Sequence, residues 1–297
     1  MAIKVVAENI NIMSKKWGKA MKAKDPKPIQ ELAAQLTENG ADLLDLNLGP
    51  ARKNGPEMMD WMVRTVQEAT DLPLYLDTTN ADAVEAGLKA YQPKMGPAVI
   101  NSISAVPEQM ERELPLVKEF NCEYVALMYS KEGIPRDENE RGILASELMT
   151  AAAEYGVSNE QAWFDPVVIP VSSQQIPLQG CINFFPMIEA IAPGAKSTCG
   201  LSNVSNGSPE RLRPILNQCC MAILINCGMY GAIVDGLDHE MIAFCKDQRN
   251  DIVEFVGKVY NEEEIDMGAL NDEEKKWAKT ARVLLNRVLY SDSWLDL

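Results

Sequence analysis

Five short apolar stretches in this chain end on an aspartate or an asparagine, and they constrain the fold more than any other feature. A buried parallel strand reads as a short apolar run, and a polar residue at its carboxyl end faces the mouth of a sheet or barrel. We expect several such ends to line one cavity that suits a neutral, nitrogen-rich ligand. The stretches are LLDLNL (43–48), LYLDTTN (74–80), AVINS (98–102), WFDP (163–166) and CGLSN (199–203).

Strand and helix patterns alternate along the chain, which predicts an α/β fold, a (β/α)8 TIM barrel with a C-terminal helix. The alternative is an open doubly wound sheet, but no glycine-rich phosphate turn follows the first strand. We expect residues 1–297 to form a single domain. The predicted strands are 3–7, 43–48, 73–77, 98–101, 123–128, 163–165 extending toward 168, 195–201 and 231–235. The predicted helices are 27–39, 56–70, 81–91, 107–120, 139–155, about 176–192, 209–225 and 239–247, followed by 271–290.

Local signals mark several helix ends. Asp25-Pro26 precedes the first long helix, Asn39-Gly40 closes it, and Gly55-Pro56 opens the next. Ser208 is the expected N-cap of helix 209–225, with Pro209 in its first turn.

The net charge and the cysteines of the chain limit its possible binding partners and its cellular location. The net charge of −15, from 28 basic and 43 acidic residues, argues against nucleic acid and anionic membranes as partners. No apolar run approaches the ~18 residues of a membrane span. Seven cysteines without framework spacing indicate free thiols in a reducing compartment, so we expect a cytoplasmic protein.

Two predicted strands, 43–48 and 73–77, supply the first site candidates. Asp45 and Asn47 lie two positions apart and therefore share one face of their strand. Asp77 ends the next strand and remains available for a ligand, because Asn80 or Thr79 fits the N-cap of the following helix. The alternative for the first pair is a buried structural polar group bonded to a neighbouring loop.

Three further residues complete the picture. Asn101 closes the fourth strand. Asp165 lies in an apolar context, where a carboxylate needs donors, either from a ligand with amidine-like N–H groups or from a salt bridge. Asn203 lies in a polar loop. His239 is the sole histidine, which excludes a multi-histidine metal site and the usual nucleophile triad, so no metal is expected.

Several blocks in one order resemble a known family. DLNLGP (45–50), LYLDTTN (74–80), VINSISA (99–105), WFDPVVIP (163–170) and GLSNVS (200–205) are similar to the methyltetrahydrofolate:corrinoid methyltransferases, a branch of the pterin-binding methyltransferases. The blocks IPRDENER (134–141), GAIVDG (231–236) and YSDSW (290–294) extend the resemblance over nearly the whole chain.

The resemblance implies a homodimeric TIM barrel with a folate pocket at its C-terminal mouth. Asp77, Asn101 and Asp165 would hold the pterin ring, with Asp165 accepting from the 2-amino group and N3–H. Asn203 would reach N5, and it and Asp77 are the expected catalytic residues. The floor and surroundings would be formed by Glu8, Asn11, Asp45 and Asn47, with Ser202 and either Arg211 or Arg213 as further candidates.

The implied reaction is methyl transfer between the cobalt of a corrinoid and N5 of tetrahydrofolate. The corrinoid (cobalamin) would be carried by a separate corrinoid protein, because this chain lacks a D-x-H-x-x-G signature. Neutral N5 would attack the methyl group and Co(I) would leave, whereas the reverse requires N5 to be protonated; Asn203 would stabilise that state, with water and a nearby aspartate assisting.

The direction of transfer stays open at this point. We predict methyl transfer from a methylcorrinoid to tetrahydrofolate, in an anaerobic demethylase system. The alternative is 5-methyltetrahydrofolate to a corrinoid iron–sulfur protein in the acetyl-CoA pathway. Outside this reaction, a dihydropteroate synthase-like enzyme and a non-catalytic folate-binding protein are the rivals.

Overall fold

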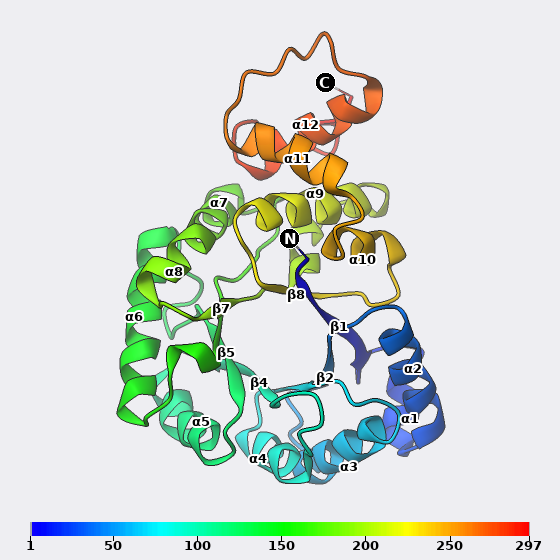
Figure 1. Ribbon diagram of the computed structural model, residues 1–297, viewed down its shortest axis with the longest axis vertical. Coiled ribbons are helices and arrows are strands. Elements are labelled where there is room, and N and C mark those ends of the chain that lie inside the picture. Colours follow the sequence, from blue (N-terminus) through cyan, green and yellow to red (C-terminus); the bar gives the residue numbers. More distant parts are fainter. Residues whose placement is uncertain (1, 297) are drawn as a thin grey trace.

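The computed structural model describes residues 2–296 and consists of a ring of parallel strands surrounded by helices (Figure 1). The strands follow the order β7-β6-β5-β4-β3-β2-β1-β8. The ring closes beyond β7, where Gly200 pairs with Ile233 in parallel. The predicted TIM barrel is therefore confirmed. The strands are β1 (Lys4–Asn11), β2 (Leu43–Gly49), β3 (Leu74–Thr78), β4 (Val99–Ser104), β5 (Glu123–Leu127), β6 (Ala162–Asp165), β7 (Lys196–Ser197) and β8 (Gly231–Val234).

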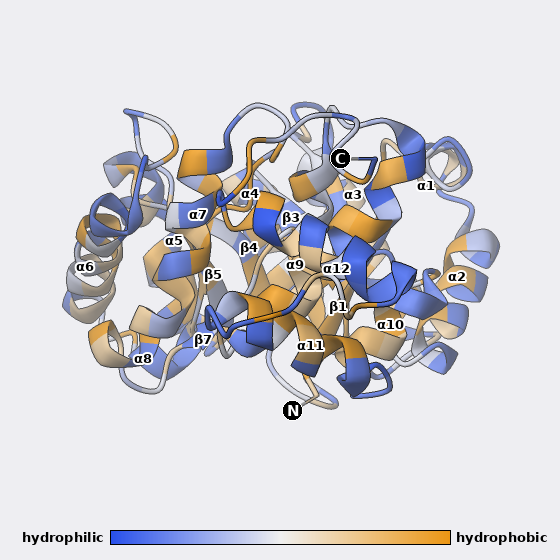
Figure 2. Ribbon diagram, turned by 90° about the horizontal axis from the view of Figure 1, so that it is seen from above, coloured by the Kyte–Doolittle hydropathy of each residue, from blue (hydrophilic) through white to orange (hydrophobic). Residues whose placement is uncertain are grey.

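Helices cover the outside of the ring, and hydrophobic residues gather on the strands and on the inner faces of these helices (Figure 2). Two helices near the C-terminus, α11 and α12, pack on α9 outside the ring (Figure 1). No helix within residues 2–296 is long and apolar enough to cross a membrane. The helices are α1 (Gly18–Ala23), α2 (Pro26–Glu38), α3 (Gly55–Gln67), α4 (Ala81–Ala90), α5 (Pro107–Glu119), α6 (Glu138–Glu154), α7 (Gln175–Phe184), α8 (Ile188–Ile191), α9 (Arg213–Asn226), α10 (His239–Cys245), α11 (Asn250–Tyr260) and α12 (Asp272–Leu284).

Most of the predicted helix ends are confirmed. The Asp25 side chain accepts from the Lys27 N–H at the start of α2, and Gly40 follows that helix with φ at 98°. Asn80 caps α4 through bonds from two backbone N–H groups. His239 is the exposed first residue of α10.

The expected N-cap at Ser208 is wrong. A short 3₁₀ turn, η4 (Glu210–Leu212), precedes α9, which begins at Arg213. The Ser208 hydroxyl instead accepts a hydrogen bond from the Tyr290 hydroxyl at 2.8 Å. A contact made 82 positions later in the chain has therefore displaced the local capping preference.

Other boundaries differ for local reasons. β6 stops at Asp165 rather than extending toward residue 168, because Pro166 has no N–H to donate and Val167 adopts a φ of 65°. The C-terminal helix ends at Leu284 instead of 290, since Asn286 takes the left-handed conformation with φ at 55°. Helix 176–192 is divided into α7 and α8, and α1 and α11 were not predicted.

Candidate functional site

The barrel interior changes from apolar to polar between two successive layers of side chains. One layer is formed by Val6, Leu43, Tyr75, Val99, Val125, Trp163 and Ile233. Side chains two positions apart on a strand point to the same side. The next layer inside the barrel, closer to the carboxyl ends of the strands, is therefore formed by the residues two positions further along each strand. They are Glu8, Asp45, Asp77, Asn101, Leu127, Asp165 and Asp235. Acids and amides thus occupy the carboxyl-terminal mouth, where TIM barrels place their active sites.

A connected group of acids and amides spans β2, β3 and β4. The strand register sets Asn47 beside Asp77 and Asp77 beside Asn101. The Asn101 amide donates to the Asp45 carboxylate at 3.1 Å, and the Asn47 amide donates to Asp77. Burial, followed by the charge of Asp77, raises the pKa of Asp45 well above its usual value. Because two carboxylates this close repel each other, one of them stays protonated. Asp45 holds the proton and donates it in a hydrogen bond to the Asp77 carboxylate.

Asp165 is a buried carboxylate that forms no ion pair within residues 2–296. Its side chain is 7% exposed and accepts from the backbone N–H groups of Val167, at 2.8 Å, and Gly200. Burial raises the pKa of Asp165 to about 7. The neighbouring Arg141 donates instead to three backbone carbonyls, one of them that of Pro166 at 2.8 Å. The salt bridge considered as an alternative for Asp165 is therefore not formed.

Glu8 connects β1 to the loop after β7. Its carboxylate accepts from the Ser202 hydroxyl at 3.5 Å. Burial, followed by the nearby charge of Asp235, raises the pKa of Glu8 to about 7. A cavity of about 440 Å³ opens beside it and is lined by Glu8, Asn9, Asn11, Met13, Ser14, Trp17 and Asp235.

Asn203 lies close to Asp165, and the backbone of Gly200 contacts both residues. It belongs to the 3₁₀ turn η3 (Leu201–Ser205), and its exposed amide oxygen accepts from the Asn206 amide at 3.2 Å. A Cβ added to Gly200 would lie 3.2 Å from the Asn203 amide nitrogen, while the Gly200 N–H bonds to Asp165. The turn therefore presents an amide beside the buried carboxylate.

The two candidate arginines stabilise this loop from other sides. Arg213 donates to the Ser205 hydroxyl at 3.3 Å, and Ser205 in turn donates to the Ser202 carbonyl at 3.2 Å. Arg211 donates to the Asp292 carbonyl at 3.2 Å. Together with the bond between Tyr290 and Ser208, this contact fastens the tail after α12 to the loop that carries Asn203.

Sequence reasoning missed two residues of the mouth. Asp235 follows β8 and accepts from the Asn9 amide at 2.6 Å, while Asn9 accepts from the Gly236 N–H at 2.8 Å. The signal was available, because GAIVD (231–235) is one more apolar stretch that ends on an aspartate.

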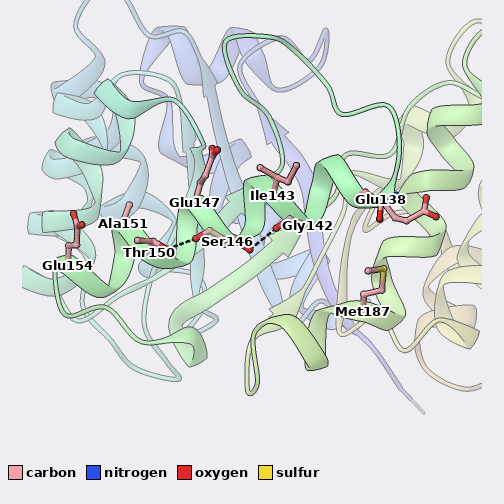
Figure 3. Close-up of a pocket in the computed structure, with 10 residues that line it drawn as sticks. Glu138, Gly142, Ile143, Ser146, Glu147, Thr150, Ala151, Glu154 and Met187 are labelled. Atoms are coloured by element: carbon pink, nitrogen blue, oxygen red, sulfur yellow. Dashed lines mark hydrogen bonds between the residues drawn. The ribbon is translucent and has the colours of Figure 1, made fainter.

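A second hollow lies along the outer face of α6, away from the strand ends (Figure 3). Its volume is about 720 Å³. Two hydroxyls in it are already bonded within the helix, Ser146 to the Gly142 carbonyl and Thr150 to the Ser146 carbonyl. Because no buried polar group points into this groove, the mouth of the barrel remains the candidate site.

The arrangement at the mouth favours one kind of ligand. Buried acids without a counter-ion are costly unless donors meet them, and perturbed carboxyls that converge in a cleft are typical of binding or catalytic sites. A planar, nitrogen-rich molecule supplies such donors, and the amides of Asn101 and Asn203 can both donate to it and accept from it. The residues present therefore fit a pterin.

Comparisons with known proteins agree with this chemistry. The model of the pterin binding enzyme family matches residues 8–235. A methylcorrinoid:tetrahydrofolate methyltransferase from Eubacterium limosum is 28% identical over 243 residues, which cover 80% of this chain and 87% of that protein. A methionine synthase from Mycobacterium tuberculosis is 27% identical over 246 residues, covering 78% of this chain but 20% of that protein.

Solved structures with this fold also bind pterin compounds. A Yersinia pestis DHPS with a pterine–sulfa conjugate superposes with a TM-score of 0.63 at 14% identity, over 84% of this chain and 94% of that one. A dihydropteroate synthase from Xanthomonas albilineans with 7,8-dihydropteroate gives 0.62 at 16% identity, over 84% and 94%. At this identity the likeness shows the fold alone. The family model, in contrast, matches well over half of the sequence, and this chain belongs to the pterin-binding enzyme family.

Proposed function

We propose that this chain is a methyltransferase that moves a methyl group from the cobalt of a methylcorrinoid to N5 of tetrahydrofolate. The observation that carries the proposal is the ring of acids and amides at the barrel mouth, in which buried Asp165 has no cationic partner among residues 2–296. The Eubacterium limosum relative, a methylcorrinoid:tetrahydrofolate methyltransferase, supports both the chemistry and its direction.

Each residue of the ring has a role in this proposal. Asp165 accepts two hydrogen bonds, from the 2-amino group and N3–H of the pterin, in a bidentate pairing. Asp77 on β3 and Asn101 on β4 bind the same ring. The floor and wall of the pocket are formed by Glu8, Asn11, Asp45, Asn47 and Ser202.

Asn203 and Asp77 are the proposed catalytic residues. The corrinoid, bound to a separate corrinoid protein, supplies an activated methyl group. When N5 becomes bonded to this group, its N–H gains positive charge, and the Asn203 amide oxygen accepts a hydrogen bond from it. Asp77, whose pKa burial raises, can hold the released proton. Precise positioning of N5 provides the larger part of the rate gain.

Assembly and location complete the proposal. We propose that residues 1–297 act as one domain, which the packing of α11 and α12 on α9 supports. The groove on α6 suits a homodimer, because Ile143 is 59% exposed beside the small residues Gly142 and Ser146. Ile143→Arg should then shift the sedimentation coefficient from that of a dimer to that of a monomer. Seven free, buried thiols support a cytoplasmic location.

A spectroscopic assay tests the function. The protein is mixed with tetrahydrofolate and methylcob(III)alamin, and we expect the cob(I)alamin spectrum to appear as 5-methyltetrahydrofolate forms. Asn203→Ala should abolish most turnover while folate binding, measured by quenching of tryptophan fluorescence, stays nearly intact. Fluorescence quenching without any spectral change would instead indicate a non-catalytic folate-binding protein. Turnover unchanged in Asn203→Ala would remove the role of that residue.

The reverse reaction is tested with the same components. Supplying 5-methyltetrahydrofolate and Co(I) corrinoid iron–sulfur protein measures transfer in the direction of the acetyl-CoA pathway. A faster rate in this direction would contradict the proposed physiological direction, although the pocket residues would act in both.

A further inference from the structure

One part of the barrel rim is basic in an otherwise acidic chain. Residues 14–24 contain five lysines and no acid, and residues 50–54 contain Arg52 and Lys53 and no acid. The chain as a whole has 28 basic against 43 acidic residues. We call these two segments together the basic rim. Both follow strands at their carboxyl ends, β1 and β2, and so lie on the same side of the barrel as the acidic mouth.

The two segments adjoin in space. Lys24, just after α1, forms an ion pair at 2.5 Å with Glu57 in the first turn of α3. Lys53 lies only four positions before Glu57, so this ion pair brings the end of α1 close to the cations before α3. Figure 1 shows α1 beside the start of α3.

Most cations of the basic rim have no acidic partner within residues 2–296. Some exposed cations elsewhere form ion pairs, as Arg64 does with Asp60 and Lys131 with Glu108, and others, such as Lys258 and Lys276, form none within residues 2–296. The basic rim differs because it gathers such cations in two short segments. Lys24 is paired, and Lys16 lies 4.0 Å from the ring centroid of Trp17. The exposed cations without an ion pair are Lys15, Lys16, Lys19, Lys22, Arg52 and Lys53. Although the chain has 43 acidic residues, these cations of the basic rim are left free to bind an external anion.

A passage connects the basic rim to the mouth. The cavity of about 440 Å³ extends from Glu8 in the mouth to Trp17 at the start of α1. Met13, which is 78% exposed, forms part of its wall. This passage is polar at its inner end and has an apolar and aromatic wall at its outer end, where the lysines begin.

Strand order determines where a bound folate would leave the mouth. In a ring of eight strands, β6 lies opposite β2, with β1 next to it. A pterin whose 2-amino edge binds Asp165 on β6 directs its opposite edge toward β1 and β2. That edge carries the aminobenzoyl-glutamate chain. The chain would therefore pass Met13 and Trp17 and reach the basic rim.

We propose that the basic rim binds the glutamate carboxylates of the folate and selects forms with several γ-linked glutamates. This inference rests on the proposed function, since it requires the pterin to occupy the mouth. Each added glutamate contributes one carboxylate to an arc of unpaired cations, and exposed ion pairs each contribute a factor of about 1.4 to 5 in affinity. Two added glutamates should thus strengthen binding about fivefold at low salt.

The test compares two variants of equal net charge. The rim variant is Lys16→Gln, Lys19→Gln, Arg52→Gln and Lys53→Gln; the control is Lys89→Gln, Lys131→Gln, Arg136→Gln and Lys258→Gln, which are exposed cations elsewhere. The dissociation constants of tetrahydrofolate with one and with three glutamates are measured by calorimetry at low salt. We expect the preference for three glutamates to vanish in the rim variant and to persist in the control.

Other outcomes would overturn the inference in distinguishable ways. If the wild-type protein binds both forms equally, or if the rim variant retains the preference, the basic rim does not bind the glutamate chain. A rim variant that retains the preference but reacts slowly with a corrinoid protein would show that the basic rim binds that protein instead. If no form of tetrahydrofolate binds the wild-type protein, the proposed function itself fails.

Discussion

The two ends of the barrel interior hold acidic side chains in opposite circumstances. At the amino-terminal end, Glu123 accepts from the Lys196 ammonium at 2.6 Å and from the Trp163 indole N–H. At the carboxyl-terminal end, Asp45 and Asp165 are buried and form no ion pair within residues 2–296. An ion pair stabilises the amino-terminal end, whereas buried carboxyls without an ion pair are retained where a ligand can supply the missing hydrogen-bond partner. The comparison separates the part of the interior that serves stability from the part that serves binding.

The largest expected effect comes from Asp165→Asn. Loss of the charge-assisted, bidentate contact should weaken tetrahydrofolate binding by about 10²- to 10³-fold, or about 3 to 4 kcal/mol. Calorimetric titration measures it, and Glu123→Gln at the opposite end serves as the control, with affinity unchanged within about twofold. Comparable affinities in Asp165→Asn and wild type would show that the unpaired carboxylate does not hold the ligand.

The second largest expected effect is a loss of stability from a substitution at the amino-terminal end of the barrel. Glu123→Gln leaves the partly buried Lys196 ammonium without its counter-charge, which should lower the free energy of unfolding by about 2 to 3 kcal/mol. Urea denaturation followed by circular dichroism measures the change. A stability equal to that of the wild type would mean that the amino-terminal ion pair is not what stabilises this end.

Asp45→Asn should stabilise the protein, and only at higher pH. Burial raises the pKa values of Asp45, Glu8 and Asp165, the last two to about 7, whereas unfolded carboxyls titrate near 4. The folded state therefore binds more protons between pH 4 and 7, and wild-type stability falls as the pH rises through this window. An asparagine can still accept from Asn101 and donate to Asp77 without titrating.

We expect Asp45→Asn to add about 1 to 2 kcal/mol at pH 8 and almost nothing at pH 4. Thermal unfolding across this pH range is the measurement. A stabilisation of the same size at both pH values would argue that packing, and not proton binding, causes it.

The smallest effect concerns the tail that fastens the open end. Tyr290→Phe removes the hydroxyl that bonds to Ser208 and Asp292, each at 2.8 Å, and should cost about 0.5 to 1 kcal/mol of stability. Greater mobility of the η3 turn should also lower turnover with little change in folate affinity. The matched control is Tyr155→Phe, since Tyr155 is a partly exposed tyrosine at the end of α6. Equal turnover in both variants would show that the contact between the tail and Ser208 does not affect catalysis.

Much of the barrel and its polar layer could be predicted because the signals are local. Two-residue periodicity within apolar runs fixes the face of Asp45 and Asp77, and Pro166 marks the end of a strand just after Asp165. These features require only a few neighbouring residues. The eight strands were accordingly all identified, although β7 is shorter than expected.

Long-range contacts account for what could not be predicted. The bond from Tyr290 to Ser208 joins residues 82 positions apart, and no local pattern indicates that it replaces a helix cap. Asp165 forms no ion pair with Arg141 because the Arg141 side chain donates to three backbone carbonyls from separate segments. The short helix α1 was missed because its lysine-rich segment lacks an apolar stripe.

The attachment of the loop at 201–212 by Tyr290 and Asp292 has a consequence for biosynthesis. During translation the loop emerges well before its fastening residues, and domains begin to fold as their sequence leaves the ribosome. Nascent chains can therefore assemble all eight strands while the turn that carries Asn203 still lacks its contacts with the tail. Competence for catalysis would be acquired late, as a step separate from assembly of the barrel.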